Sequence, residues 1–149
     1  MSIKFDLDKE WKDSSLPVVN GIAYPDGRVE KVYVISEDRE RKIEIGEELD
    51  INALLSKEEI DIVEVAELGQ VDGLNSGIIV HYGMGFMGGD GFIVVESKAD
   101  SSIKWAAFFE DSNPFERAEV VGDAIYAYNN LGEKWRFDIN NPVDVSIVN

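Results

Sequence analysis

The sequence predicts a mainly β (α+β) fold, an antiparallel sheet or two-sheet meander with one or two short helices near residues 47–60. Three observations favour this fold class. Runs of β-branched and aromatic residues recur roughly every ten to fifteen residues, glycine, aspartate or asparagine separates them, and one stretch has helical spacing. Because its 149 residues show no internal repeat and no linker-like composition, the chain is expected to form a single globular domain over 1–149.

The N-terminal part is expected to begin its β structure around a tight turn. Residues 25–27 (Pro-Asp-Gly) lie between two β-rich runs, and proline presets φ while glycine accepts positive φ. After this turn, residues 29–36 alternate in a strand-like but ambiguous way, because apolar residues fall in both phases. Residues 41–46 continue this pattern.

The segment 47–60 is the best helical candidate. Leu49, Ala53 and Leu54 are at helical spacing among good helix formers. An alternative splits the segment, with Asp50 capping a short turn at 51–55 and Ser56 capping another turn just after it. The alternation that follows, in 61–68, predicts a strand.

From residue 77 onward the pattern is β almost throughout. Expected strands cover 77–84, 91–97, 103–111, 124–130 and 133–139. The last two are predicted to form a hairpin whose turn is Asn129–Gly132, since apolar residues alternate on both sides of it.

Charge is the most unusual global property of the chain. Thirty acidic and fourteen basic residues give a formal net charge of −16, and residues 37–67 alone carry a net −8. We therefore expect no nucleic-acid or anionic-membrane partner, because both would be repelled, whereas a basic protein partner would be attracted. The alternative is that the acidity serves solubility alone.

Other composition features narrow the class of protein. Cysteine is absent, which excludes disulfides, a thiolate zinc site and a cysteine nucleophile. No apolar run approaches the ~20 residues of a membrane helix, and the first residues lack the apolar region of a signal peptide. A cytoplasmic location is expected.

The glycine-rich stretch 81–92, HYGMGFMGGDGF, contains the only histidine of the chain. A phosphate-binding loop would open a helix, but these glycines lead into a β-branched strand. A metal site would use His81 with Asp90 and Asp72, but it lacks further nitrogen or sulfur ligands and matches no EF-hand spacing. We therefore expect a connection between two strands, with no metal and no cofactor.

The side chains of this loop allow two roles. Met84, Phe86 and Met87 are expected either to fill the core or to form an exposed, adaptable contact surface.

No pattern indicates catalysis. There is no GxSxG nucleophile motif, one histidine would be the sole base, and paired carboxylates carry no specificity in so acidic a chain. We expect a protein that is not an enzyme. Trp105 and Trp135 are expected in the core, although a carbohydrate-type ligand-binding β-domain would use Trp105, Trp135 or Tyr128 as stacking platforms.

The C-terminal third has a distinctive texture, SNPF at 112–115 and AYNNLGEKWRFDINNP at 127–142. With its size and acidity, the chain resembles small acidic bacterial immunity proteins of polymorphic and contact-dependent toxin systems. The resemblance implies a non-enzymatic cytoplasmic inhibitor that binds the C-terminal domain of a cognate toxin, often a nuclease. It carries no defined set of functional residues over to this chain.

The physical counterpart of this resemblance is an acidic surface that occupies the basic groove of a nuclease. Aromatic or methionine residues nearby would supply the buried anchors of such an interface. The alternatives are a solvated helix face with an edge strand, or a structural or regulatory acidic domain with no toxin partner. The partner-binding residues predicted in this way are Glu47, Glu48, Asp50, Glu58, Glu59, Asp61 and Glu64.

Overall fold

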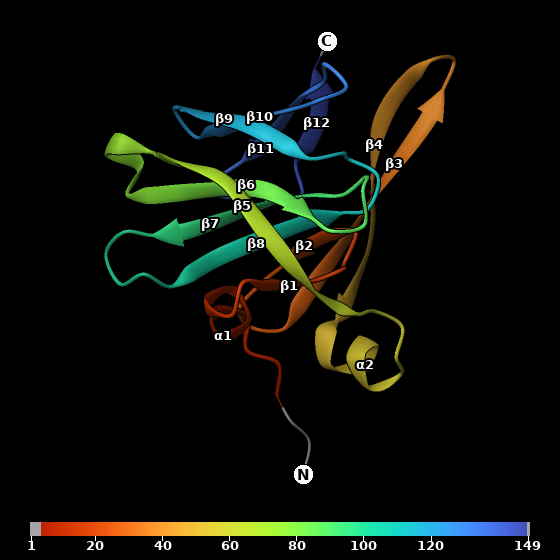
Figure 1. The fold of residues 1–149 in the computed structure, drawn as a ribbon, viewed down its shortest axis with the longest axis vertical. Helices are drawn as coiled ribbons and strands as arrows, with labels where there is room; N and C mark the ends of the chain where they lie inside the picture. Colours follow the sequence, from red (N-terminus) through yellow and green to blue (C-terminus); the bar gives the residue numbers. More distant parts are fainter. Residues whose placement is uncertain (1–3, 149) are drawn as a thin grey trace.

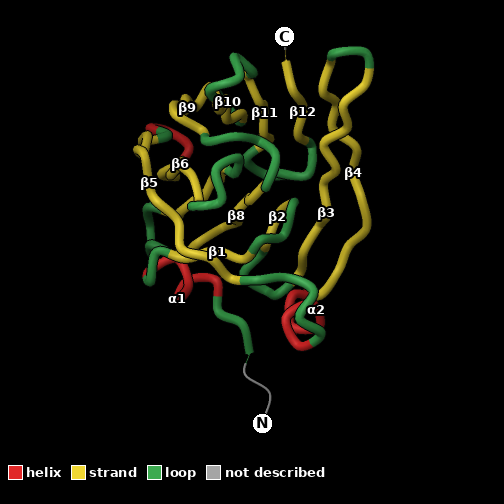
Figure 2. The backbone as a smooth tube through the Cα atoms, turned by 45° about the vertical axis from the view of Figure 1, so that its right-hand side comes forward, coloured by secondary structure: helices red, strands yellow, loops and turns green. Residues whose placement is uncertain are grey.

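The strands form two antiparallel sheets, as the sequence predicts. The computed structural model describes residues 4–148. In chain order the elements are α1 (Leu7–Lys12), β1 (Ser15–Pro17), β2 (Gly21–Ala23), β3 (Arg28–Glu37), β4 (Glu40–Asp50), α2 (Ile51–Ser56), β5 (Ile62–Asp72), the 3₁₀ turn η1 (Leu74–Ser76), β6 (Ile78–Gly85), β7 (Gly91–Ser97), β8 (Ile103–Phe109), β9 (Phe115–Val121), β10 (Ala124–Asn129), β11 (Lys134–Asp138) and β12 (Val145–Val148). The eight-stranded sheet has the order β1-β5-β6-β7-β8-β2-β3-β4 and the four-stranded sheet the order β12-β11-β10-β9 (Figures 1 and 2).

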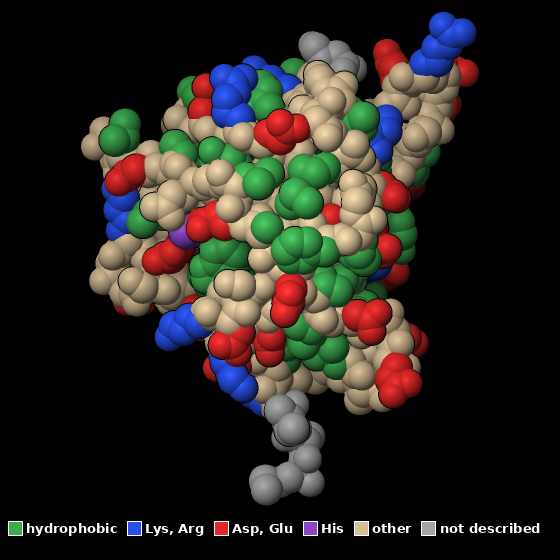
Figure 3. Space-filling model, in the orientation of Figure 1, with side chains coloured by type: hydrophobic (Ala, Val, Ile, Leu, Met, Phe, Trp, Pro, Cys, Tyr) green, Lys and Arg blue, Asp and Glu red, His purple; other side chains and the backbone are tan. Residues whose placement is uncertain are grey.

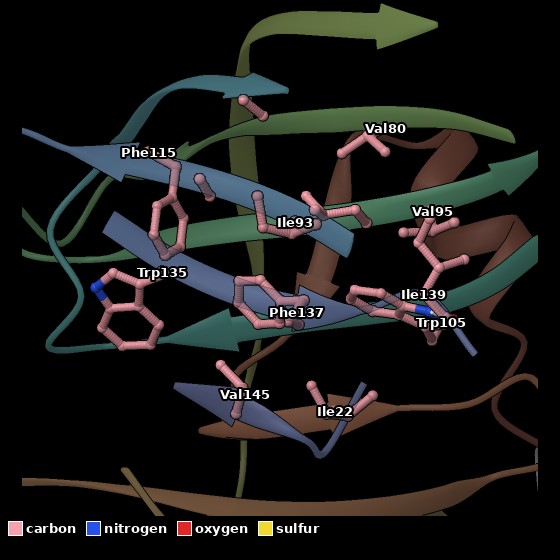
Figure 4. Packing of buried hydrophobic residues seen from close by; sticks show 14 of the residues in the cluster. Ile22, Val80, Ile93, Val95, Trp105, Phe115, Trp135, Phe137, Ile139 and Val145 are labelled. Atoms are coloured by element: carbon pink, nitrogen blue, oxygen red, sulfur yellow. Dashed lines mark hydrogen bonds between the residues drawn. The ribbon is translucent and has the colours of Figure 1, made fainter. Parts of the chain in front are cut away.

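The four-stranded sheet covers one face of the larger sheet and closes an aromatic core. The ring centroid of Trp135 lies 5.1 Å from that of Phe109 and 5.5 Å from that of Phe115 (Figure 4). Trp105 donates its indole N–H to the carbonyl oxygen of Ile139 at 2.9 Å, which satisfies the polar atom of that buried ring. The core therefore joins strands of both sheets.

The opposite face of the larger sheet is covered by short elements. On β7, Ile93 and Val95 belong to the aromatic core, whereas Phe92 and Val94 belong to a second cluster under α1, α2 and the N-terminal segment. Both faces of β7 are buried, so its first five residues show no burial alternation. Figure 1 shows the helices at the end of the molecule away from the four-stranded sheet.

The predicted hairpin over 124–139 is confirmed. β10 and β11 pair in register from Ala124↔Asp138 to Tyr128↔Lys134. Asn129 shapes the turn, because its side-chain oxygen accepts hydrogen bonds from the backbone N–H groups of Leu131 (3.1 Å) and Glu133 (2.9 Å).

The ambiguous alternation after the Pro-Asp-Gly turn has a structural cause. Gly27 has φ +93°, as the turn requires, and β3 follows directly. The pairing of β3 with β4 then shifts register between Glu30 and Val32. The extra residue of this bulge is on β4, and β3 keeps its alternation, with Val29 in the second cluster and Val32 in the aromatic core. Because β3 is buried on both faces here, an apolar residue falls in each phase.

The helix expected within residues 47–60 is confirmed, but it covers only Ile51–Ser56 and not the whole segment. Residues 47–50 continue β4, where Leu49 pairs with Val29 and packs against the second cluster. α2 begins after Asp50, whose side chain makes no capping hydrogen bond. It ends before Lys57, and Glu58 has φ +56°, so the second capped turn at 57–60 does not form a helix.

The helix α1 was not predicted. Asp6 caps it, because its carboxylate accepts a hydrogen bond from the backbone N–H of Lys9 at 3.2 Å. Leu7 is its buried residue, and Trp11 packs on Phe92 with ring centroids 5.6 Å apart. No helix within residues 4–148 is long and apolar enough to cross a membrane.

The hairpin β3–β4 extends beyond the rest of the sheet as an arm, seen at the upper right of Figures 1 and 2. Arg41 ties the arm to the β10–β11 turn, since its guanidinium binds both carboxylate oxygens of Glu133 at 2.7 and 2.8 Å. It also donates to the carbonyl oxygen of Asp111 at 2.7 Å. The outer edge of β4 is an edge of the larger sheet.

Candidate functional site

All seven acidic residues predicted to bind a partner are exposed. Three of them, Glu47, Glu48 and Asp50, lie at the end of β4. The other four lie around the α2–β5 connection and the start of β5; they are Glu58, Glu59, Asp61 and Glu64. Acidic side chains gather beside α1 and α2 at the lower part of the face drawn in Figure 3.

Two of the three acids of the β4 group are engaged by neighbouring side chains. Glu47 accepts hydrogen bonds from the Tyr33 hydroxyl at 2.8 and 3.0 Å. Its own backbone N–H and this hydroxyl hold the pKa of Glu47 below its ordinary value. Arg28 reaches Glu48 at 3.8 Å. This part of the acidic run contains structural contacts of the β3–β4 hairpin.

The α2–β5 group differs in this respect. Among the described residues, no cation lies within ion-pair distance of Glu58, Glu59, Asp61 or Glu64. Four carboxylates on one short stretch that form no ion pair raise the local negative potential. We call these four residues the acidic site.

The acidic site borders a small depression of about 170 Å³. Glu59 and Asp61 form part of its wall, and Met87 from the glycine-rich loop and Glu110 complete it on other sides. Lys31 also lines the depression, with its ammonium donating to the carbonyl oxygen of Val19 at 2.9 Å. The fold thus brings together segments that are far apart in the sequence.

The glycine-rich loop is a connection between β6 and β7, as expected, and it presents apolar side chains to solvent. Phe86 is 66% exposed and Met87 is 51% exposed. Both side chains are therefore exposed rather than part of the core, and their role as a contact surface stays a prediction. Large apolar side chains next to unpaired carboxylates are typical of a protein-binding surface, which needs buried anchors as well as charge.

Asp90 anchors this loop through a buried hydrogen bond to its backbone. Its carboxylate is fully buried and accepts a hydrogen bond from the backbone N–H of Gly85 at 3.1 Å. A Cβ on Gly85 would collide with the same carboxylate, so the close approach requires glycine there. The second oxygen of Asp90 has no hydrogen-bond partner among the described residues. Asn113 also fixes the loop, by donating its backbone N–H to the carbonyl oxygen of Gly89 at 2.7 Å.

A larger groove of about 580 Å³ lies on the other side of the acidic site, between α1 and α2. Phe5, Leu55 and Ile62 form its apolar surface, and Lys9 and Glu10 lie on its wall. Ile62 is itself partly exposed at the start of β5. The apolar surface of this groove therefore reaches Ile62, which follows Asp61 of the acidic site in the chain.

His81 lies in a polar cluster that the sequence did not reveal. Its two ring nitrogens face two carboxylates, Glu67 at Nδ1 and Glu96 at Nε2, the latter at 2.7 Å. Trp11 covers the imidazole with its ring centroid 5.0 Å away. Both carboxylates receive a hydrogen bond only when both ring nitrogens carry a proton. The strand register across β5, β6 and β7 brings these residues together.

The three residues that a metal site would use do not lie together in one site. His81 contacts glutamates, Asp90 holds the glycine-rich loop, and Asp72 forms an ion pair with Lys98. No group of three histidine, cysteine or acidic side chains among residues 4–148 is arranged to hold a metal ion.

The tryptophans of the carbohydrate-binding alternative are core residues. Trp105 is 2% exposed and Trp135 is 0% exposed, so neither offers a stacking surface. The face of Tyr128 is covered by the guanidinium of Arg117, 4.0 Å from the ring centroid. The burial of both tryptophans therefore excludes them as stacking platforms of a carbohydrate-type ligand-binding domain.

Two contributions to the candidate site were missed by sequence reasoning. Lys31 and Glu110 join the acidic site through tertiary contact alone, and no local pattern indicated them. The candidate site therefore combines exposed carboxylates with an exposed apolar side chain, Met87. No family model, curated protein sequence or solved structure matches this chain.

Proposed function

We propose that this protein is a non-enzymatic immunity protein, which binds and neutralises the toxin domain of a bacterial toxin system through its acidic site. The observation that carries the proposal is the depression in which Glu59 and Asp61 of the acidic site meet the exposed Met87 of the glycine-rich loop. Glu58 and Glu64 extend the acidic site along the chain, and exposed Phe86 is next to Met87 in the loop. The resemblance to small acidic immunity proteins supports the same function.

The physical basis is complementarity with a basic active site. A nuclease binds phosphates in a cationic groove, and carboxylates compete for the same cations. Opposite charge accelerates association, while apolar anchors at the centre of the interface slow dissociation. In this protein the acidic site would supply the first effect, and Phe86 and Met87 would supply the second.

The experiment is retention of partners from a lysate of the native cells. The immobilised protein is compared with the variant Glu58→Gln, Glu59→Gln, Asp61→Asn at low and moderate salt, and retained proteins are identified by mass spectrometry. We expect the unsubstituted protein to retain a basic toxin domain, and the variant to retain at least about tenfold less, because three charge contacts of about 0.5 kcal/mol each are lost.

A matched control removes three other exposed acids, with Glu116→Gln, Asp123→Asn and Asp144→Asn. The net charge changes equally, but these residues lie in or beside the four-stranded sheet, away from the acidic site. Equal loss with the control would mean that total charge, and not the acidic site, determines binding. Retention of no basic protein by either form would contradict the inhibitor function and favour an acidic structural domain.

A further inference from the structure

The strand β4 is the last strand of the larger sheet, and its outer side has no partner strand. In the described part of the chain, β3 is the only strand that pairs with β4. β12 approaches β4 from the side of the aromatic core, but no backbone hydrogen bond within residues 4–148 joins these two strands. An open edge presents a row of unpaired N–H and C=O groups, to which another strand can pair. Figures 1 and 3 show the arm of β3 and β4 projecting from the molecule, where a second protein can reach it.

The turn of the arm fixes the direction of the backbone groups on β4. Asp38 has φ +48° and Arg39 has φ +70°, so they form the two-residue loop of a type I′ hairpin. The residues that flank such a loop, here the pair Glu37↔Glu40, exchange backbone hydrogen bonds. The N–H and C=O groups of Glu40 therefore point towards β3.

The backbone groups of β4 that are free for pairing belong to alternate residues. On an antiparallel strand these groups point to the two neighbours in turn. Since those of Glu40 point towards β3, the groups that point to the open edge are those of Arg41, Ile43 and Ile45. Beyond Ile45 the register shift against β3 leaves an extra residue on β4, which ends the regular edge. The edge available for pairing is therefore residues 41–45, and we call it the β4 edge.

We propose that the β4 edge pairs antiparallel with the β4 edge of a second copy of this chain, with Ile43 of the two copies directly opposed. Free backbone groups must oppose free backbone groups, so the registers with the most overlap are centred on residue 42, 43 or 44. A centre at Lys42 would oppose two lysines and a centre at Glu44 two glutamates, and like charges directly opposite are unfavourable. A centre at Ile43 instead opposes Lys42 to Glu44 of the other copy, and the twofold symmetry forms this pair twice.

The same register covers exposed apolar surface. Ile45 is 58% exposed, although it lies only two residues from Ile43, which packs against the aromatic core. In the dimer Ile45 lies opposite Arg41 of the other copy and diagonal to its Ile43, so part of the exposed side chain is covered by these two neighbours.

The charges near the β4 edge allow self-association in a chain of net charge −16. Residues 41–45 contain two cations and one acid, and charges are screened beyond about 8 Å at physiological salt. A lysine on an edge strand usually opposes pairing, but here Glu44 of the other copy supplies its partner. Within one copy Lys42 reaches Glu37 at 3.9 Å in an exposed pair, so its ammonium can turn to the new partner. This surface is separate from the acidic site, and the inference does not rest on the proposed inhibitor function.

The first test is sedimentation velocity at protein concentrations up to about 1 mM, the range of weak interfaces. We expect the dimer fraction to rise with concentration. Lys42→Glu should raise the dissociation constant of the dimer at least about tenfold, because two opposite-charge pairs become like-charge pairs. The double variant Lys42→Glu, Glu44→Lys should regain most of the affinity, since the same two pairs form with their charges exchanged.

The matched control is Lys104→Glu, at an exposed cation of β8, which changes the net charge equally and should leave the dissociation constant unchanged. A protein that stays monomeric at every concentration would overturn the proposal. Equal weakening by the control would do the same, because total charge and not the β4 edge would then determine association.

The second test reads the register by a disulfide. The chain has no cysteine, so Ile43→Cys introduces a single thiol at the centre of the pair. Directly opposed, hydrogen-bonded residues have Cα atoms about 5.5 Å apart, a distance that a disulfide spans. Mild oxidation should therefore link this variant into dimers, whereas Ile35→Cys, on β3 of the same arm, should stay unlinked. Equal cross-linking at both positions would contradict pairing through the β4 edge.

Discussion

The two faces of the eight-stranded sheet are buried by different means. One face is covered by a second sheet, whose alternating residues close an aromatic core around Trp135 and Phe137. The other is covered by α1 and α2, two helices of six residues each, with the chain segments next to them. Short helices leave gaps, and the groove of about 580 Å³ lies between them.

Because of this difference, the aromatic core lies on one face of the larger sheet and the candidate site lies at the border of the other. The sheet-covered face holds the large aromatic side chains, and the buried polar groups there, Asn129 and the indole N–H of Trp105, have hydrogen-bond partners. The helix-covered face holds the His81 cluster, and the acidic site lies at its border. Binding surfaces tend to lie on loops and element ends that a rigid scaffold positions, and this side of the protein has that construction.

The largest expected effect is a loss of stability when the core of the sheet-covered face is truncated. Phe137→Ala removes a fully buried ring and should lower the free energy of unfolding by about 3–5 kcal/mol, measured by urea denaturation. Phe86→Ala makes the same chemical change at an exposed position of the glycine-rich loop. It should change the free energy of unfolding by less than about 0.5 kcal/mol. Equal losses in the two variants would contradict the assignment of Phe86 to a contact surface.

Sequence reasoning reached the fold class because its signals are local. The hairpin of β10 and β11 has alternating residues on both sides of an Asn-Asn-Leu-Gly turn, and each feature acts within a few residues. α1 was missed because six residues with one buried side chain carry too little periodicity, and its stability comes from Trp11 packing on Phe92.

The candidate site shows where sequence reasoning stops. Exposure of the acids in 47–64 follows from their charge, and sequence patterns suffice for it. In the β4 group, Glu47 and Glu48 are engaged by Tyr33 and Arg28, which reach them through the β3–β4 pairing, whereas the α2–β5 group has no such partner among the described residues. Likewise, Glu67 and Glu96 meet His81 only through strand register, which local sequence does not specify in detail.

The second prediction concerns the ion pair that joins the arm to the sheet-covered face. Hydrogen bonds from the Arg41 guanidinium above all, and from the Asn129 and Trp135 side chains, lower the pKa of Glu133 from 4.5 to about 2. A carboxylate with a lowered pKa in the folded state stabilises the protein above its unfolded pKa, and this stabilisation is lost as pH falls towards the folded pKa. The free energy of unfolding should therefore drop between pH 4.5 and 2, by up to about 3 kcal/mol from this group.

The measurement is urea denaturation across that pH range with and without Glu133→Gln. The variant should lose stability at neutral pH and show a correspondingly shallower dependence on pH. Glu116→Gln, at an exposed glutamate of β9, is the control and should retain the full slope. A variant profile parallel to that of the unsubstituted protein would show that Arg41 and Glu133 do not hold the arm in solution.

The smallest of these effects concerns the contribution of the His81 cluster to the stability of the helix-covered face. His81→Leu leaves Glu96 without its hydrogen-bond partner beneath Trp11, at a cost of about 1–3 kcal/mol in the free energy of unfolding. Glu67 is more exposed than Glu96 and can turn to water, so Glu96 dominates the loss. Because the cost comes from an unsatisfied carboxylate, the double variant His81→Leu, Glu96→Leu should regain part of it. If the double variant were instead less stable than His81→Leu alone, the glutamate would be stabilising the fold through contacts other than the histidine. A full recovery would mean that the polar cluster contributes nothing to the stability of this face.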